Sequence, residues 1–543
     1  MDFNELLQQT NFTALDWAIV VIYPLISVVL GLVASRFIAD MDDFVVAGRG
    51  VRTALGFATL TGTELGLVTV MYSAEMGFTG GFAAMHMGLA AGVVAFFVGL
   101  TGFIIAGLRR HEVLTISEYY GTRFGPRTRI LGGIILAFGG ILNMGMFLRA
   151  GSIFIVGVTG MPTGHFLGPL GYVELVMLAL LLLVLFYTVM GGMISVVLAD
   201  YVQFVVLSIG LIVAVFLAVN RLGWGNIFDT VSAELGTEGF DPFVSQQFGW
   251  DYVGWMMFLG VVNCALWPTS VARALAAKSE QTVKRQFMLA SASYAIRNIV
   301  PIFLGVGAFV LVMEMPALQD MFFSEATEAI PNRSLYAFPV FLGRILPVGL
   351  IGLISAAMLA AFMSTHDSYF LCWSSVLAND VIAPLLRGEW FRDPARHTGI
   401  ELTQRQRVLL TRVLIVLIGV AIYAVSMLYQ LGQSLWDYMA VTGAVYYSGA
   451  FALLVAGLYW KRASSTGAVL SIFTGCLAVF GLTQLRAWML IDVLGFSEGV
   501  MAHVTTERVG LGVIALTMLV MFLGSVLRPD KPNDTTPAPV REG

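Results

Sequence analysis

The sequence is poor in cysteine and in charge. Its 543 residues include three cysteines, and only 12% of residues are charged. Cys264, Cys372 and Cys476 all fall in apolar segments, which argues against a disulfide framework and a cysteine-rich metal site. No basic patch stands out, so the sequence indicates no nucleic-acid partner. The polar stretches are also short, and none is long enough for a separate catalytic domain: Asn220–Asp251, Glu314–Phe338 and Arg387–Arg407 are the longest.

Apolar residues dominate instead. They make up 58% of the chain, and the mean hydropathy is +0.84. Thirteen apolar stretches approach or exceed the roughly 20 residues that span a bilayer as a helix, and they are continuous rather than alternating. We therefore predict an all-α integral membrane protein in a lipid bilayer. The stretches are Trp17–Ala34, Ala54–Met71, Phe82–Leu108, Ile130–Val158, Leu175–Val189, Ile194–Val219, Tyr252–Val271, Phe287–Met313, Val348–Leu386, Leu409–Leu428, Met439–Tyr459, Ala468–Leu485 and Val509–Leu527.

The basic residues predict an orientation. Most of the 30 Lys and Arg residues lie on one side of these segments, and the side with few of them holds only Arg221, Arg333, Arg344, Arg486 and Arg508. By the positive-inside rule, the N-terminus is outside and the C-terminus is cytoplasmic. The acidic start Met1–Asp16 lacks a basic region, which favours an uncleaved first helix over a signal peptide. We expect a multi-pass protein of the plasma membrane, or of the inner membrane in a Gram-negative cell.

Two predicted helices are interrupted at their middles. Thr61-Gly-Thr-Glu-Leu-Gly66 places two glycines and a carboxylate in the second segment, and Asn263-Cys-Ala-Leu-Trp-Pro268 places a proline in the seventh. Broken helices at membrane depth are tolerated where the freed carbonyls line a cavity or meet a ligand. The two segments are five apart, which predicts two five-helix repeats of opposite orientation, each opening with a broken helix. The alternative is two kinks that serve packing alone.

A cluster of oxygen-bearing side chains lies in the ninth segment. Ser364, Thr365, Asp367 and Ser368 occur within an otherwise apolar stretch. Steps of three and four place Ser364, Asp367 and Ser368 on one helical face. Hard cations prefer oxygen ligands, so the cluster predicts a site for an ion such as sodium.

Several short motifs occur in order along most of the chain. They are Phe44–Arg49, Leu114–Tyr119 with Arg123, Tyr187–Gly192 with Ala199–Gln203, Arg273–Lys278, and Met363–Thr365 followed by Ala378–Asp380. These motifs resemble those of the sodium:solute symporter family, which includes sodium-coupled sugar, proline, pantothenate and sialic acid transporters. The resemblance implies a leucine-transporter-like core of ten helices, with one helix before it and two after. The expected parts are an extra helix and loop (1–53), a first repeat (54–219), a second repeat (252–460), two further helices (461–528) and a cytoplasmic tail (529–543).

The resemblance also implies an ion site. In this family, sodium is held by backbone carbonyls and side-chain hydroxyls. The matching groups here are the carbonyls of Gly62, Leu65 and Ala361 and the hydroxyls of Ser364 and Thr365. Some members bind a second sodium, and Asp200, Ser364, Asp367 and Ser368 match that arrangement. Because Asp367 replaces a residue that is usually a hydroxyl, the second ion is sodium, a proton or absent. Asp200 has the alternative role of a paired carboxylate at a helix end.

The solute is expected to occupy the space between the two breaks, bounded by Glu64, Asn263, Trp267 and either Arg149 or Arg297. Each arginine costs about 3 kcal/mol to insert at mid-helix, so each is expected to find an anion. The anion is either a substrate carboxylate or a protein partner, for example Glu64 beside Arg149.

Other motifs bear on which solute this is. Pro268–Arg273 resembles the spacing in proline, pantothenate and acetate carriers. The sugar carriers' Tyr-Trp pair and glutamate are replaced here by Asn263, Cys264 and Gly88. A carboxylate or amino acid is therefore favoured over a sugar.

The overall prediction is sodium-coupled symport of a small organic solute by alternating access. A sodium/sugar symporter and a non-transporting sensor of the same fold are the alternatives. An enzyme is disfavoured because no nucleophile with a base and no metal-ligand cluster is found. His86 and His366 are lone histidines on apolar helices, for which a hydrogen-bonded core role is favoured over a proton relay. The sequence predicts no oligomeric state.

Overall fold

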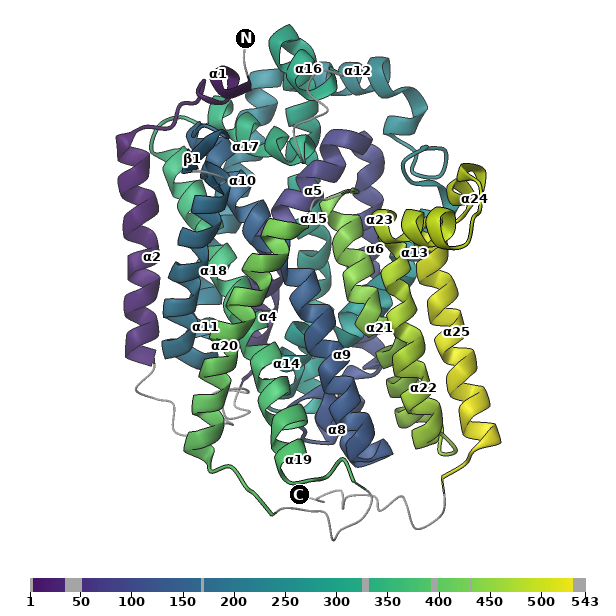
Figure 1. Cartoon of the computed structure of the whole chain (residues 1–543). Coiled ribbons are helices and arrows are strands. Elements are labelled where there is room, and N and C mark those ends of the chain that lie inside the picture. Colours follow the sequence, from purple (N-terminus) through teal and green to yellow (C-terminus); the bar gives the residue numbers. More distant parts are fainter. Residues whose placement is uncertain are drawn as a thin grey trace.

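In the computed structural model the chain is a bundle of helices that run between two faces (Figure 1). The structure describes residues 3–34, 51–167, 170–324, 332–391, 399–429 and 432–530. One face carries α1, α12, α16 and the N-terminus, and we call it the N-terminal face; the opposite face carries α8 and α19. The predicted all-α membrane architecture is confirmed, and in the described ranges the strands are a short antiparallel pair on the N-terminal face.

The elements follow in chain order. The first part contains α1 (Phe3–Leu7), α2 (Ala14–Ala34), α4 (Thr53–Glu64), α5 (Leu67–Gly80), α6 (Met85–Thr101), α7 (Ile105–Arg110), α8 (Ile116–Phe124), α9 (Pro126–Met144), α10 (Phe147–Thr159), β1 (His165–Leu167), β2 (Leu170–Gly171), α11 (Tyr172–Leu222) and α12 (Trp224–Leu235). The second part contains α13 (Gly249–Leu266), α14 (Pro268–Ala276), α15 (Glu280–Glu314), α16 (Pro316–Phe323), α17 (Arg333–Ile345), α18 (Leu350–Val376), α19 (Ala383–Leu386), α20 (Gln404–Leu428), α21 (Leu435–Tyr459), α22 (Ser465–Gly475), α23 (Thr483–Ala487), α24 (Glu498–His503) and α25 (Thr506–Leu527).

The helices do not correspond one to one with the thirteen predicted segments. Eight described helical stretches are long and apolar enough to cross a membrane, or up to ten if each of two bent pairs counts as one span. The break within the second segment divides it into α4, which is too short to count alone, and α5, which is counted together with α6 as one stretch, Leu67–Thr101. The first bent pair is α13 and α14, at 41°. The helix count and the repeat boundaries therefore stay predictions.

The long element α11 covers two predicted segments. The N–H of Tyr172, at its start, donates to the carbonyl of Gly164, whose neighbour Thr163 donates to Asn4. Arg221, at its end, shares a cavity with Gln9, Thr10 and Asn11. A straight helix of 51 residues would separate its ends by about 76 Å, yet both ends lie beside the N-terminal segment. The chain therefore reverses direction within this run, which agrees with two crossings.

Peripheral helices flank a more deeply buried centre. In the view of Figure 1, α2 lies beside α11 at one edge, and α22 and α25 lie at the other. Along α18, nearly every residue from Ile354 to Phe370 is buried. α18 therefore runs through the interior of the bundle, where its polar side chains must find partners.

Candidate ion and solute site

The first break is an interruption of the helical hydrogen bonds between α4 and α5. The α4 helix ends at Glu64, and the N–H of Leu65 donates to the carbonyl of Thr61 (3.0 Å). Gly66 is extended, with φ −85° and ψ 165°, before α5 begins at Leu67. The carbonyls of Gly62 and Leu65 thus lie at a helix end, where regular intrahelical partners are lost. The predicted discontinuity is confirmed at this position.

Gly66 brings this break against α18. A Cβ atom added to Gly66 would lie 2.3 Å from Oγ1 of Thr365 and 3.4 Å from its Cβ. Only a glycine permits this approach, because a larger residue would collide with the hydroxyl. The hydroxyl of Thr365 also donates to the carbonyl of Ala361 (2.9 Å). The two halves of the expected sodium site, predicted from segments 300 residues apart, are therefore adjacent in space.

The other oxygen-bearing residues of α18 face different neighbours. Asp367 is fully buried and accepts a hydrogen bond from Thr188 of α11. Ser368, one residue later, accepts from Nη2 of Arg273 in α14 (2.7 Å). The two side chains therefore bond to different elements, Asp367 to α11 and Ser368 to α14. The side chain of Asp200 lies outside the described residues, as do Phe44–Arg49, and the second ion site stays a prediction.

Glu64 and Arg297 form a buried ion pair between α4 and α15. Oε2 of Glu64 lies 2.8 Å from Nη1 of Arg297, and the two side chains are 13% and 6% exposed. Ser270, just after the second break, donates its hydroxyl to Oε1 of Glu64 (2.6 Å). The guanidinium of Arg297 also stacks over the ring of Tyr294, 3.9 Å from its centroid. Glu64 therefore connects the first break to the helix that follows the second.

Arg149 lies elsewhere, which corrects the alternative that paired it with Glu64. Its Nε and Nη2 both donate to the carbonyl of Ser426 near the end of α20 (3.1 and 2.8 Å). The carbonyls in the last turn of a helix lack intrahelical donors, and a cation satisfies them well. Of the two arginines considered from the sequence, the structure brings Arg297 to the other candidate residues and leaves Arg149 between α10 and α20.

The second break carries a cluster of aromatic rings. α13 ends at Leu266, Trp267 is extended (φ −63°, ψ 123°), and Pro268 begins α14. Nε1 of Trp267 donates to the hydroxyl of Tyr369 (2.7 Å), and its ring packs against Tyr447 and Trp373. Tyr447 in turn donates to Oδ1 of Asn263 (2.8 Å). Trp267 and Asn263 are thus joined through Tyr447, which the sequence analysis did not single out.

The chain matches one known protein family over most of its length. The sequence model of the sodium:solute symporter family matches residues 44–475, most of the chain and both breaks. The chain belongs to the sodium:solute symporter family. The family resemblance noted in the sequence is thereby confirmed.

Relatives and a solved structure agree with this assignment. The symporter is 22% identical over 490 residues to a sodium/proline symporter of Staphylococcus aureus, covering 87% of this chain and 86% of that protein. It is 24% identical over 372 residues to a sodium-dependent multivitamin transporter of Oryctolagus cuniculus, covering 67% of this chain and 53% of that protein. Its fold is similar to that of a sodium-coupled sialic acid symporter in a substrate-bound outward-open state, with a TM-score of 0.73, 18% identity and coverage of 96% and 99%. The chain is a multi-pass, sodium-coupled solute symporter.

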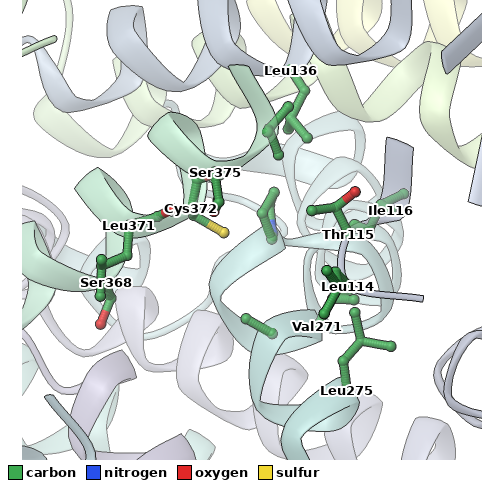
Figure 2. Close-up of a pocket in the computed structure, with 13 residues that line it drawn as sticks. Leu114, Thr115, Ile116, Leu136, Val271, Leu275, Ser368, Leu371, Cys372 and Ser375 are labelled. Atoms are coloured by element: carbon green, nitrogen blue, oxygen red, sulfur yellow. Dashed lines mark hydrogen bonds between the residues drawn. The ribbon is translucent and has the colours of Figure 1, made fainter. Parts of the chain in front are cut away.

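Two cavities lie on either side of the aromatic cluster. One, of about 50 Å³, is lined by Asn263, Cys264, Arg297 and the rings of Tyr72 and Trp436. The other, of about 20 Å³, lies among α14, α18 and the segment before α8, and includes Ser368, Cys372 and Ser375 (Figure 2). Each holds only a few water molecules at most. The second break lies between the two linings, because Asn263 and Cys264, which line the first cavity, precede Trp267, and Pro268 and Val271, which line the second, follow it.

Glu75 joins three elements near the N-terminal face. This carboxylate of α5 is 5% exposed. It accepts from the hydroxyl of Ser334 in α17 (2.6 Å) and from the N–H of Leu435 at the start of α21 (3.0 Å). No local feature of the sequence points to this role, since both partners lie more than 250 residues away. Glu75 therefore joins α5 to α17 and to the start of α21.

The two histidines bond within their own helices. Nδ1 of His86 lies 2.7 Å from the carbonyl of Ala83, and Nδ1 of His366 lies 2.8 Å from that of Phe362. Such local bonds fit the core role that the sequence favoured.

Proposed function

We propose that the symporter binds sodium between the first break and α18, with ligands from Gly62, Leu65, Ala361, Ser364 and Thr365. The close approach of Gly66 to Thr365 supports this proposal more than any other observation. Carbonyls and hydroxyls are neutral, so the bound ion keeps its charge. The membrane potential then acts on it with about 2.3 kcal/mol per charge per 100 mV.

We infer that the solute carries a carboxylate. Arg297 lines the cavity on the N-terminal side of the aromatic cluster, and its Nε has no hydrogen-bond partner among the described residues. A guanidinium binds a carboxylate in a bidentate manner with two parallel hydrogen bonds. Asn263 and Cys264 offer small polar groups beside it, as expected for an organic acid or amino acid rather than a hexose.

Transport follows from alternating closure on the two sides of the aromatic cluster. We place the N-terminal face outside and the protein in the plasma membrane, as the distribution of basic residues predicts. Sodium binds first and stabilises the outward-open state, which raises the affinity for solute by reciprocal coupling. The aromatic cluster then separates the occupied cavity from the cytoplasmic side until the core helices rearrange.

Uptake into proteoliposomes tests the sodium site. Thr365→Ala removes one hydroxyl ligand, and we expect the sodium concentration for half-maximal uptake to rise about tenfold, from the loss of one charge-assisted contact. Thr474→Ala is the matched control, because its hydroxyl bonds only to its own helix at an exposed position. Unchanged sodium dependence in Thr365→Ala would refute the site. The solute for this assay comes from a thermal-shift screen of acids, amino acids and sugars with and without sodium.

Two native cysteines report alternating access. Cys264 lines the cavity on the N-terminal side and Cys372 the cavity on the opposite side. Variants that keep only one of them, with the others replaced by alanine, are labelled with a membrane-impermeant thiol reagent from either side. We expect sodium to increase labelling of Cys264 from outside and to decrease labelling of Cys372 from inside. Parallel changes at both cysteines would contradict alternating access.

A further inference from the structure

A third cavity lies at the N-terminal face, away from the transport site. Its volume is about 430 Å³, much larger than the central cavities. The polar residues lining it are Gln9, Thr10, Asn11, Arg221 and Arg344. We call it the arginine cavity. It lies where the N-terminal segment, the end of α11, the end of α15 and the last turn of α17 meet.

The charge of the lining is entirely positive. Arg221 and Arg344 are its only ionisable residues, and neither makes an ion pair within the part of the chain that the structure describes. The nearest carboxylate along the chain, Glu314, lies beside Met315 and accepts from Nδ2 of Asn226 (2.6 Å). Arg221 and Arg344 are also two of the few basic residues on the side of the protein where such residues are scarce. Among the described residues, the two cations therefore share one concave space with no carboxylate paired to either of them.

Arg344 is held rigidly in place. Its Nη2 donates to the carbonyl of Leu6 (2.6 Å) and its Nη1 to that of Val340 (3.3 Å). The side-chain amide of Asn11 donates to the carbonyl of Arg344 (3.1 Å), and the N–H of Asn11 to that of Gly343 (2.7 Å). Burial lowers the pKa of the Arg344 guanidinium to about 10, which still leaves it protonated at neutral pH. A partly buried cation satisfied only by neutral carbonyls gains from an anion nearby.

We propose that the arginine cavity binds a phosphate-type oxyanion, held by the guanidinium groups of Arg344 and Arg221 with the side chains of Gln9, Thr10 and Asn11 at its edge. Guanidinium groups match the geometry of phosphate oxygens, and amides and hydroxyls complete the hydrogen bonds. The same chemistry is offered by free phosphate and by the head group of an acidic phospholipid at the membrane surface. This proposal does not depend on the proposed sodium and solute sites.

Thermal unfolding of the purified protein tests the free-anion source. Inorganic phosphate at constant ionic strength is expected to raise the unfolding midpoint in a saturable manner, since it binds the folded state. The double variant Arg221→Gln with Arg344→Gln is expected to weaken apparent phosphate binding by about tenfold or more, from the loss of two charged donors. Arg508→Gln is the control, because Arg508 is exposed on the same side and pairs with Asp251 (2.6 Å).

Native mass spectrometry from nanodiscs tests the lipid source. With phosphatidylglycerol, the wild-type protein is expected to retain lipid that the double variant loses. With phosphatidylcholine, the two proteins are expected to retain equal amounts of lipid. An arginine-dependent effect of phosphate alone assigns a soluble anion, and arginine-dependent retention of phosphatidylglycerol assigns a head group; either supports the site. Equal behaviour of wild type and variant in both arms overturns the proposal. Arg221→Gln alone, at an exposed position, and Arg344→Lys, which keeps the charge, decide the matter if the double variant does not fold.

Discussion

The two helix breaks both interrupt helices of the core, but they are built from different residues. The first, at Leu65 and Gly66, has little bulk, and its glycine lies against the hydroxyl of Thr365. The second, at Trp267 and Pro268, holds a large ring that bonds to Tyr369 and packs on Tyr447. A small ion needs close backbone oxygens, whereas an organic solute needs a shaped wall of side chains. We therefore propose that the ion binds at the first break and the solute at the second.

Glu64 is the side chain that joins the two breaks, so removing its charge has the largest expected effect. Glu64→Gln leaves Arg297 buried without its carboxylate, and we expect the free energy of unfolding to fall by about 3 kcal/mol, as when one partner of a buried pair is lost. Chemical denaturation of the detergent-solubilised protein measures this change.

The matched control for Glu64→Gln is Asp251→Asn, which removes a carboxylate from an exposed ion pair with Arg508. We expect this control to change the free energy of unfolding by less than about 1 kcal/mol. Similar losses in both variants would mean that the buried pair does not hold the two breaks together.

The sequence revealed the breaks better than it revealed their partners. Glycine and proline weaken a helix, so discontinuities could be predicted near Gly66 and Pro268 from local chemistry, although Pro301 lies inside the continuous helix α15. The partner of Glu64 was harder to predict, because Arg149 and Arg297 both lie in apolar segments. The packing of α4 on α15 makes Arg297 the partner. Tyr369 directly follows the oxygen cluster in the sequence, yet its bond to Trp267 depends on a residue 102 positions away.

Gly66→Ala tests the first break as an ion site. The added methyl would lie 2.3 Å from Oγ1 of Thr365, so α5 and α18 must separate. Overpacking of this kind costs about 1 to 3 kcal/mol. If that cost falls on the ion-bound state, the sodium concentration for half-maximal uptake rises by about 5- to 100-fold.

Gly254→Ala in α13 is the control for Gly66→Ala, because nothing lies within 4 Å of its added Cβ. The sodium concentration for half-maximal uptake by Gly254→Ala should match that of the wild type. If Gly66→Ala instead alters the apparent affinity for solute and leaves that for sodium unchanged, the ion does not belong to the first break.

Trp267→Phe tests the second break as a solute wall. The change keeps a ring but removes the hydrogen bond to Tyr369, worth about 1 kcal/mol. We expect KM for solute to rise about fivefold while the sodium dependence at saturating solute stays unchanged. Trp255→Phe in α13, the helix that ends just before Trp267, is the comparison, since its Nε1 has no partner among the described residues. A shift in sodium affinity with constant KM would reverse the assignment of ion and solute.

Glu75→Gln probes how the first broken helix is held closed at the N-terminal face, and its expected effect is the smallest. The amide keeps the shape of the side chain but weakens its bonds to Ser334 and to the N–H of Leu435, by about 0.5 to 1 kcal/mol in total. The closed conformation should be destabilised by that amount relative to the open one, because the hydrogen bonds that join α5 to α17 and α21 are weaker. In the variant that keeps only Cys264, labelling from the N-terminal face should therefore accelerate about two- to fivefold, with no acceleration at Cys372. Ser334→Ala removes one of the two bonds and should give a smaller acceleration in the same direction, and equal rates in all three proteins would show that Glu75 does not restrain this face.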